Sequence, residues 1–157
     1  IAEIAGVFIG FGALISAAGE QSKDARNKLV SVAFIGITVL VSAILPVWLA
    51  RFGLGGAALW EWSSAGFLAL IWATILIAFS DGDFRRWHLE DAKANLPRAV
   101  LFWVFLEIPI QVSLVLAILG VAPSLAPAFY VTALVLNLFE AAMMLARHIL
   151  ARPASAA

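Results

Sequence analysis

The chain alternates long apolar runs with short polar linkers. A helix needs about 20 mostly apolar residues to cross a bilayer, and the runs that come close to this length cover about residues 1–18, 29–50, 57–79, 98–120 and 127–149. Membrane-spanning strands alternate polar and apolar residues over about ten positions, whereas these runs are apolar at odd and even positions alike. The pattern predicts an all-α, polytopic transmembrane bundle of about five spans, because a helix satisfies its own backbone hydrogen bonds in lipid.

The linkers have the composition of turns and solvated loops. The longest of them separates the third and fourth runs and reads SDGDFRRWHLEDAKANLP. Asp81 or Asp83 is suited to cap a helix in this linker, and Phe84, Trp87 and Asp91 follow at helical spacing. The linker therefore predicts either a short helix on the membrane surface or a solvated loop that its tryptophan anchors at the headgroup level.

The Lys and Arg residues gather at one end of the predicted helices. Nine of the ten lie in the first and third linkers, at their edges or near the C-terminus: Lys23, Arg26, Lys28, Arg85, Arg86, Lys93, Arg98, Arg147 and Arg152. Because cytoplasmic segments of membrane proteins are enriched in Lys and Arg, we expect the N-terminus outside and the C-terminus in the cytoplasm. Residues 1–150 then form a single transmembrane domain, and residues 151–157 form a short cytoplasmic tail.

Two glutamates lie deep inside the last two runs. Glu107 follows Arg98 by nine residues, which at 1.5 Å per residue is about 13 Å from the inner boundary. Glu140 precedes Arg147 by seven residues, which is about 10 Å from the same boundary. Consecutive antiparallel helices joined by a short turn normally pack together. We therefore expect the two carboxyl groups in one layer of the inner half of the bilayer.

Each of these glutamates has a polar companion on its own helix face. Gln111 follows Glu107 by four residues, and Asn137 precedes Glu140 by three. Side chains at these spacings lie one above the other on a helix. Pro109 adds a further polar group, because its missing N–H leaves a backbone carbonyl four residues earlier without its helical donor.

These groups have two interpretations. Carboxyl, amide and open carbonyl oxygens could ligate a hard cation or carry a proton, and acids within membrane spans are functional by default. Alternatively, protonated glutamates and the two amides serve as interhelical glue, at about 0.6 kcal/mol per hydrogen bond. A third carboxylate, Glu61, is predicted near the outer interface, as a charge at an outer mouth, a surface carboxylate or a partner of Arg51.

The first run contains Gly6 and Gly10 at GxxxG spacing. Small residues at this spacing let a second helix approach closely. We expect this flank to pack against a helix, either of the same chain or of another subunit.

Composition excludes several classes of function. Hydrophobic residues make up 64% of the 157-residue chain and charged residues 13%, against about 25% charged residues in soluble domains. Formal net charge is zero, so nothing points to a nucleic-acid partner. The chain has no cysteine and two histidines, His88 and His148, so we expect neither a metal site nor a cofactor. No nucleotide-binding or hydrolase motif appears, and we expect no enzyme activity.

The segment AEIAGVFIGFGALI at residues 2–15, followed by a basic linker, resembles a group of small multi-pass bacterial membrane proteins to which no activity is assigned. The resemblance implies a multi-pass protein of the bacterial inner membrane.

Two functions fit these patterns. The first is a small oligomeric channel or transporter for cations or protons that uses Glu107 and Glu140. A chain of five helices leaves little room for an internal pore, so we expect a homo-oligomer around a central axis. The second is a non-conducting accessory or scaffold subunit of a larger membrane complex, in which the first helix docks a partner.

Overall fold

The computed structural model describes Gly6, Gly10 and residues 23–150, with the backbone alone for residues 23–30, 98 and 147–150. The described residues are helical apart from short turns and contain no strand. Their elements are α2 (Lys23–Arg51), α3 (Gly56–Ser80), α4 (Gly82–Ala94), α5 (Leu96–Phe102), the π-helix η1 (Trp103–Glu107), α6 (Ile108–Ile118), the 3₁₀-helix η2 (Pro123–Leu125) and α7 (Ala126–Leu150).

Four helical segments are long and apolar enough to cross a membrane: Ser31–Arg51, Gly56–Ser80, Ala99–Ile118 and Pro123–Ala146. The predicted all-α class is therefore confirmed, and these four segments coincide with the second to fifth apolar runs. The first predicted span, at about residues 1–18, lies outside the described residues except for Gly6 and Gly10.

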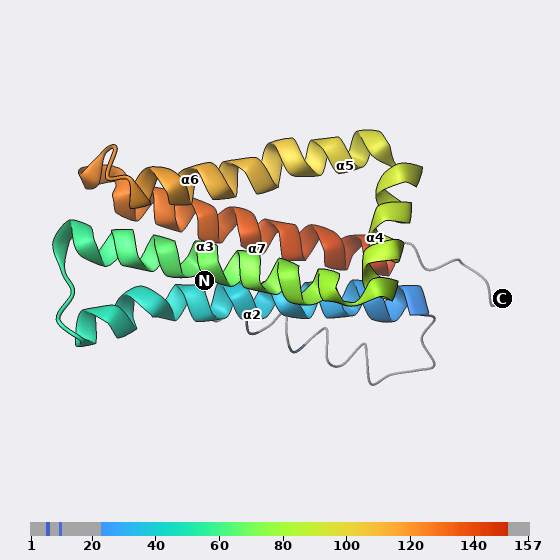
Figure 1. Cartoon of the computed structure of the whole chain (residues 1–157), viewed down its shortest axis with the longest axis horizontal. Helices are drawn as coiled ribbons and strands as arrows, with labels where there is room; N and C mark the ends of the chain where they lie inside the picture. Colours follow the sequence, from blue (N-terminus) through green and yellow to red (C-terminus); the bar gives the residue numbers. More distant parts are fainter. Residues whose placement is uncertain (1–5, 7–9, 11–22, 151–157) are drawn as a thin grey trace.

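The long helices form an up-and-down bundle. In Figure 1, α2, α3, the continuous α5–η1–α6 segment and α7 lie side by side, and successive helices run in opposite directions. Helix α2 packs against α3 and α7, and α6 packs against the same two helices on the opposite side of the bundle. Neighbouring helices are antiparallel all the way round, as in bundles with short connections. Helix α4 crosses one end of the bundle and connects α3 to α5 (Figure 1).

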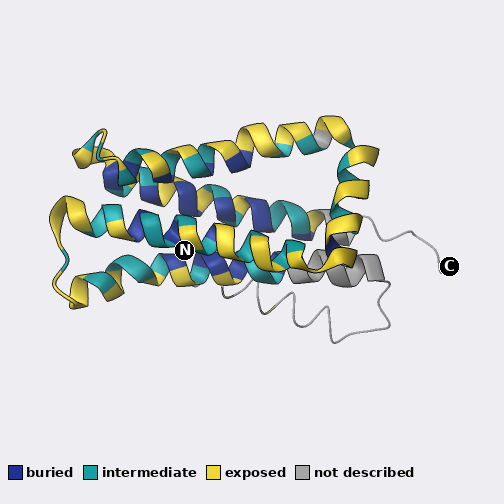
Figure 2. Ribbon diagram, viewed as in Figure 1, coloured by how far each residue is buried: buried dark blue, intermediate teal, exposed yellow. Residues whose placement is uncertain are grey.

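Apolar and polar side chains are not distributed as in a soluble helical bundle. Large apolar side chains cover the outward faces, and Leu76, Phe105 and Leu119 are 64–70% exposed, so that Figure 2 shows exposed residues along the outside of every long helix. Lipid makes such exposure harmless, and small or polar residues can then occupy the interior. Buried polar residues accompany the apolar core, namely Thr38, Ser42, Ser63, Ser64, Glu107, Asn137 and Glu140.

A tight turn makes α6 and α7 antiparallel neighbours. Gly120 follows α6 with a positive φ of 61°, a conformation that glycine adopts without the steric cost of a Cβ. The N–H of Val121 reaches back to the carbonyl of Leu116, which is the pattern of a glycine-capped helix end. Helix α7 therefore returns directly alongside α6.

A proline inside α2 explains one contact between α2 and α7. Pro46 has no N–H, so the carbonyl of Ser42, four residues earlier, loses its usual helical donor. The hydroxyl of Tyr130 on α7 donates to this same carbonyl at 2.5 Å. Tyr130 is 1% exposed and Ser42 is fully buried. A side chain of one helix thus supplies the hydrogen bond that the proline removes from another.

Tyr130→Phe is predicted to lower the free energy of unfolding by about 1–2 kcal/mol, because it leaves a buried carbonyl without a donor. In a Pro46→Ala background the alanine N–H restores the helical donor, so the same change should cost less than half as much. Unfolding in mixed micelles with increasing denaturing detergent measures both values. An equal loss in the two backgrounds would show that the tyrosine does not replace the missing N–H.

Candidate functional site

The polar interior is centred on two carboxyl groups from adjacent helices. The side chain of Glu107, at the end of η1, lies within hydrogen-bonding reach of Gln111 on α6 and of Glu140 on α7. Glu107 is 8% exposed and Glu140 is 5% exposed. The structure thus brings together, within a single chain, the two glutamates predicted to lie in one layer and the predicted polar companion of the first.

Contact between two carboxyl groups has a chemical consequence. An ionised carboxylate accepts hydrogen bonds but has none to donate. A hydrogen bond between Glu107 and Glu140 therefore requires a proton on at least one of them. The amide of Gln111 can donate to the partner that remains ionised. The arrangement is suited to hold one proton between two buried oxygen ligands.

The wide turn η1 directs Glu107 inward. The N–H of Ile108 bonds to the carbonyl of Trp103, five residues earlier, instead of the usual four. Pro109 follows directly, and its ring would clash with the carbonyl of Phe105 in a regular helix. A wide turn relieves such a clash by inserting one residue. The distortion predicted as an open carbonyl thus takes the form of a π-helical turn.

This turn also changes which residues face the bundle. Trp103, Val104 and Phe105 are 46–64% exposed, whereas the next two residues, Leu106 and Glu107, are both buried. π-helical turns frequently occur at functional sites. The position of η1 beside a buried carboxyl group therefore indicates that this part of the bundle is a candidate functional site.

The opposite pair of helices contributes hydroxyl groups at the same depth. Oγ1 of Thr38 on α2 lies 3.1 Å from Oγ1 of Thr74 on α3. A carboxyl oxygen of Glu61 lies 3.7 Å from the position of a Cβ on Gly120, which aligns α3 with the end of α6. Thr74 follows Glu61 by thirteen residues, and Glu107 precedes Gly120 by thirteen. Both residues therefore lie about 20 Å along their helices from the contact between Glu61 and Gly120. All four long helices therefore supply polar groups to one layer.

Asn137 lies one helical turn before Glu140 on α7 and is 5% exposed. Its Oδ1 has no hydrogen-bond partner among the described residues, and neither do the hydroxyl oxygens of Ser42, Ser63 and Ser64. Buried polar atoms are normally satisfied by protein or water. The interior thus offers acceptor oxygens beyond those of the carboxyl pair.

Glu61 and the two N-terminal glycines lie apart from this layer. Glu61 is half-buried near Gly120, at the end of the bundle away from α4. In the described part of the chain no ion pair joins it to Arg51. Gly6 and Gly10 are helical and exposed, and no described atom lies within 4 Å of a Cβ built on either. Their predicted packing partner is therefore not among the described residues of this chain.

Helix α4 decides between the two alternatives predicted for the third linker, because this segment forms a short helix and not a loop. Asp81 caps it, with one carboxyl oxygen accepting from the N–H groups of Asp83 at 2.8 Å and Phe84 at 3.1 Å. Phe84 is the buried anchor of this helix. Its ring stacks with His88 at 6.2 Å between centroids, and Phe79 of α3 meets the same histidine edge-on. This aromatic cluster attaches α4 to the end of the bundle.

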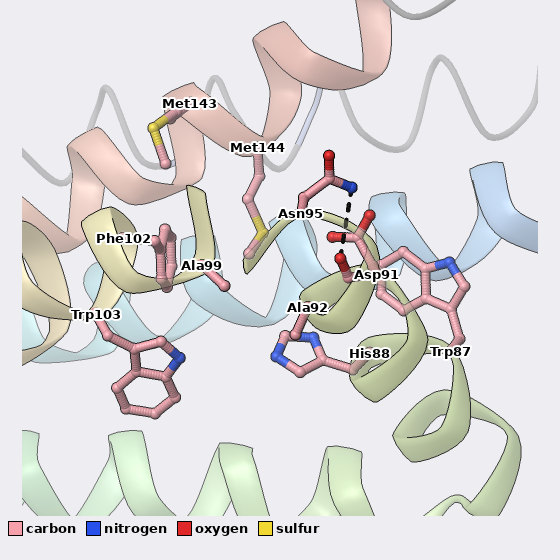
Figure 3. Close-up of a pocket in the computed structure, with 10 residues that line it drawn as sticks. All are labelled: Trp87, His88, Asp91, Ala92, Asn95, Ala99, Phe102, Trp103, Met143 and Met144. Atoms are coloured by element: carbon pink, nitrogen blue, oxygen red, sulfur yellow. Dashed lines mark hydrogen bonds between the residues drawn. The ribbon is translucent and has the colours of Figure 1, made fainter. Parts of the chain in front are cut away.

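A pocket lies between α4, α5–η1 and α7, with a volume of about 80 Å³. Figure 3 shows side chains of all these elements around it. The lining residues are Trp87, His88, Asp91, Ala92, Asn95, Ala99, Phe102, Trp103, Met143 and Met144. Sequence reasoning missed this pocket, because its walls come from three separate segments.

Among the described residues, no group of three or more His, Asp or Glu side chains is placed to hold a metal ion. The chain matches no known family model, and no curated protein or solved structure is significantly similar to it. The candidate site must therefore be interpreted from its own geometry.

The histidine of the aromatic cluster leads us to expect that the stability of α4 depends on pH. Burial lowers the pKa of His88 below its ordinary value of 6.5, and the nearby Asp91 carboxylate opposes this shift. The pKa in the folded protein thus lies below that of the unfolded chain. The stabilisation from the neutral ring is complete above about pH 6.5 and is lost as the pH falls through the folded-state pKa.

We expect the amides of α4 to exchange with solvent faster at pH 5.5 than at pH 7.5, after correction for the intrinsic rate of exchange. His88→Phe keeps an aromatic ring that does not titrate, so it should remove this dependence. Hydrogen exchange followed by mass spectrometry measures both proteins, with the amides of α6 as an internal reference. A pH dependence that persists unchanged in the variant would assign the effect to another group.

Proposed function

We propose that the protein transports protons or monovalent cations across the bacterial inner membrane and that the Glu107–Glu140 pair binds and releases them. The observation that carries the proposal is the contact between two buried carboxyl groups within membrane-crossing segments. An acid at the centre of a span costs roughly 2.5 kcal/mol or more on insertion scales, and such residues usually mark ion pathways or proton relays.

The chemistry of the pair suits reversible binding. Two adjacent carboxylates repel one another strongly in a medium of low dielectric constant. Loss of the shared proton would therefore leave a site with high affinity for another proton or a small cation. Oxygen atoms of Gln111 and Asn137, which lie one turn from the two glutamates on the same helices, are suited to solvate that charge, because hard cations prefer oxygen ligands.

The pathway proposed here runs through each subunit. The sequence predicted a pore on the axis of an oligomer. The burial of both glutamates within one bundle instead favours a path for single protons or ions between the helices of each chain. Glu61, near the opposite end from α4, is the candidate charge at the outer mouth. The exposed Gly6 and Gly10 are the candidate contact with a second copy of the chain.

We also propose five spans, with the N-terminus outside and the C-terminus in the cytoplasm, since nine of the ten Lys and Arg residues fall in the first and third linkers, at their edges or near the C-terminus. Fusing alkaline phosphatase, which is active only outside the cytoplasm, to the C-terminus tests this orientation. We expect an inactive fusion there and an active one in the α2–α3 turn after Gly53. The reverse pattern would place Glu61 at the cytoplasmic end of the bundle instead of at the outer mouth.

In liposomes carrying a pH-sensitive dye and a potassium diffusion potential, the wild-type chain should conduct protons or sodium ions. Glu107→Gln and Glu140→Gln should each lower the flux by about tenfold or more, because they remove an ionisable relay group. Glu90→Gln on α4 changes an exposed carboxylate away from the pair and should leave the flux unchanged. Absence of flux in wild type, or normal flux in both core variants, would refute transport through this pair.

An accessory or scaffold subunit is the second candidate. The open flank of Gly6 and Gly10 favours it, and in that case the carboxyl contact serves to hold α6 against α7. Two results together would establish this function instead: the wild-type chain conducts no ions, and a variant with Gly6 and Gly10 changed to leucine no longer binds a membrane partner that the wild type binds.

A further inference from the structure

The pocket between α4, α5–η1 and α7, called the pocket beneath α4 from this point, lies beside the carboxyl pair. Trp103 lines it from η1 and precedes Glu107 by four residues. Met144 lines it from α7 and follows Glu140 by four. Four residues of helix span about 6 Å. Because α4 crosses this end of the bundle (Figure 1), the pocket lies between the pair and the end of the bundle.

This pocket is open to its surroundings and large enough for water. None of the residues that line it is fully buried. Its volume of about 80 Å³ is several times the roughly 10–15 Å³ that one water molecule needs. Water also needs polar partners, and His88 and Asn95 supply polar groups in the wall that α4 forms (Figure 3). The pocket is therefore suited to hold water that connects the solvent at this end with the region of the pair.

On the other side of the pair, the interior is packed with apolar side chains. On α6, Leu114 follows Glu107 by seven residues. On α7, Ala133 precedes Glu140 by the same number. Both are 0% exposed, and they belong with Phe67 of α3 to one hydrophobic cluster. Because closely packed side chains leave few voids large enough for water, this cluster closes the interior between the pair and the end of the bundle away from α4.

Two methionines lie between the pocket and Glu140. Met143 and Met144 follow this glutamate by three and four residues, so they lie one turn along the same face of α7. In Figure 3 the side chain of Met144 points into the pocket. Methionine has three rotatable bonds and adapts readily to its surroundings. A change of side-chain rotamer is therefore sufficient to connect the pocket with the carboxyl pair, without movement of a helix.

We infer that the pocket beneath α4 is the water-filled access to the carboxyl pair, with Met144 as its flexible wall. The pair then exchanges a proton or a hydrated monovalent cation with the α4 end of the bundle, while the apolar cluster closes the opposite side. Transport requires a second state in which the cluster opens, as in alternating access. The inference names the access route of the proposed function and rests on it for the identity of the ion, but water access to the pocket can be measured independently.

Single cysteines test this access, because the chain contains no cysteine of its own. The full chain is reconstituted in liposomes as Met144→Cys, Leu101→Cys or Ala133→Cys, with a positively charged, water-soluble thiol reagent on both faces. Such a reagent modifies thiols that ionise in contact with water. Met144→Cys should react about tenfold or more faster than the other two variants, because only its thiol lies in the pocket.

The two control positions separate access from depth and from burial. Leu101 is 56% exposed and does not line the pocket. It lies six residues from Glu107 toward the α4 end, so it is closer to that end than Met144, and depth alone would favour its reaction. Ala133 reports on the closed apolar cluster. Ala99→Cys is a second probe of the pocket with a smaller change in side-chain volume, and it should react as Met144→Cys does.

Modification of Met144→Cys places a bulky cation in the pocket, and it should lower the flux in the liposome assay by about tenfold relative to the unmodified variant. The reagent should leave the wild-type flux unchanged. Equal reaction rates at Met144, Leu101 and Ala133, or no reaction at either pocket position, would overturn the access whatever the flux. Unchanged flux after modification would show that the pocket lies off the pathway. Fast reaction in the pocket without any wild-type flux would uphold the water access and refute transport.

Discussion

The contact between Glu107 and Glu140 is the interaction on which the rest of the interior depends. Two acids can lie together within membrane-crossing helices only if they share a proton or neutralise their charge with a ligand. The amide of Gln111 lies beside the pair and can donate to the carboxylate that remains ionised. The same requirement also ties α6 to α7, because neither carboxyl group could remain buried if the helices separated.

Two prolines disturb the helices, and the structure accommodates each in a different way. Pro46 removes a donor within α2, and the hydroxyl of Tyr130 replaces it from α7. Pro109 disturbs the segment before α6, and a wide turn absorbs the distortion within the same segment. The hydrogen bond from Tyr130 couples α2 to α7, whereas the wide turn directs the side chain of Glu107 into the bundle. Both place a local break in helix geometry where a polar group is needed inside.

The proximity of Glu107 and Glu140 could be predicted from sequence, because helical rise is constant and each glutamate lies a similar number of residues from a basic residue on antiparallel helices. The helix at α4 could be predicted because its cap, Asp81, and its aromatic residues are close together in the chain. The hydrogen bond from Tyr130 to the carbonyl of Ser42 could not be predicted from sequence. Pro46 shows only which carbonyl lacks its helical donor and does not show which side chain replaces that donor. The threonine pair and the pocket beneath α4 depend on the register between helices distant in sequence, which local patterns do not determine.

Infrared spectroscopy tests the shared proton most directly. At neutral pH the wild-type protein should show a carbonyl stretch of a protonated carboxyl group that shifts in D₂O. The account predicts that Glu107→Gln or Glu140→Gln alone shifts this band, because the hydrogen-bond partner changes, and that the double variant abolishes it. Glu61→Gln should leave the band in place. A wild-type spectrum without the band, or a double variant that retains it, would contradict the shared proton.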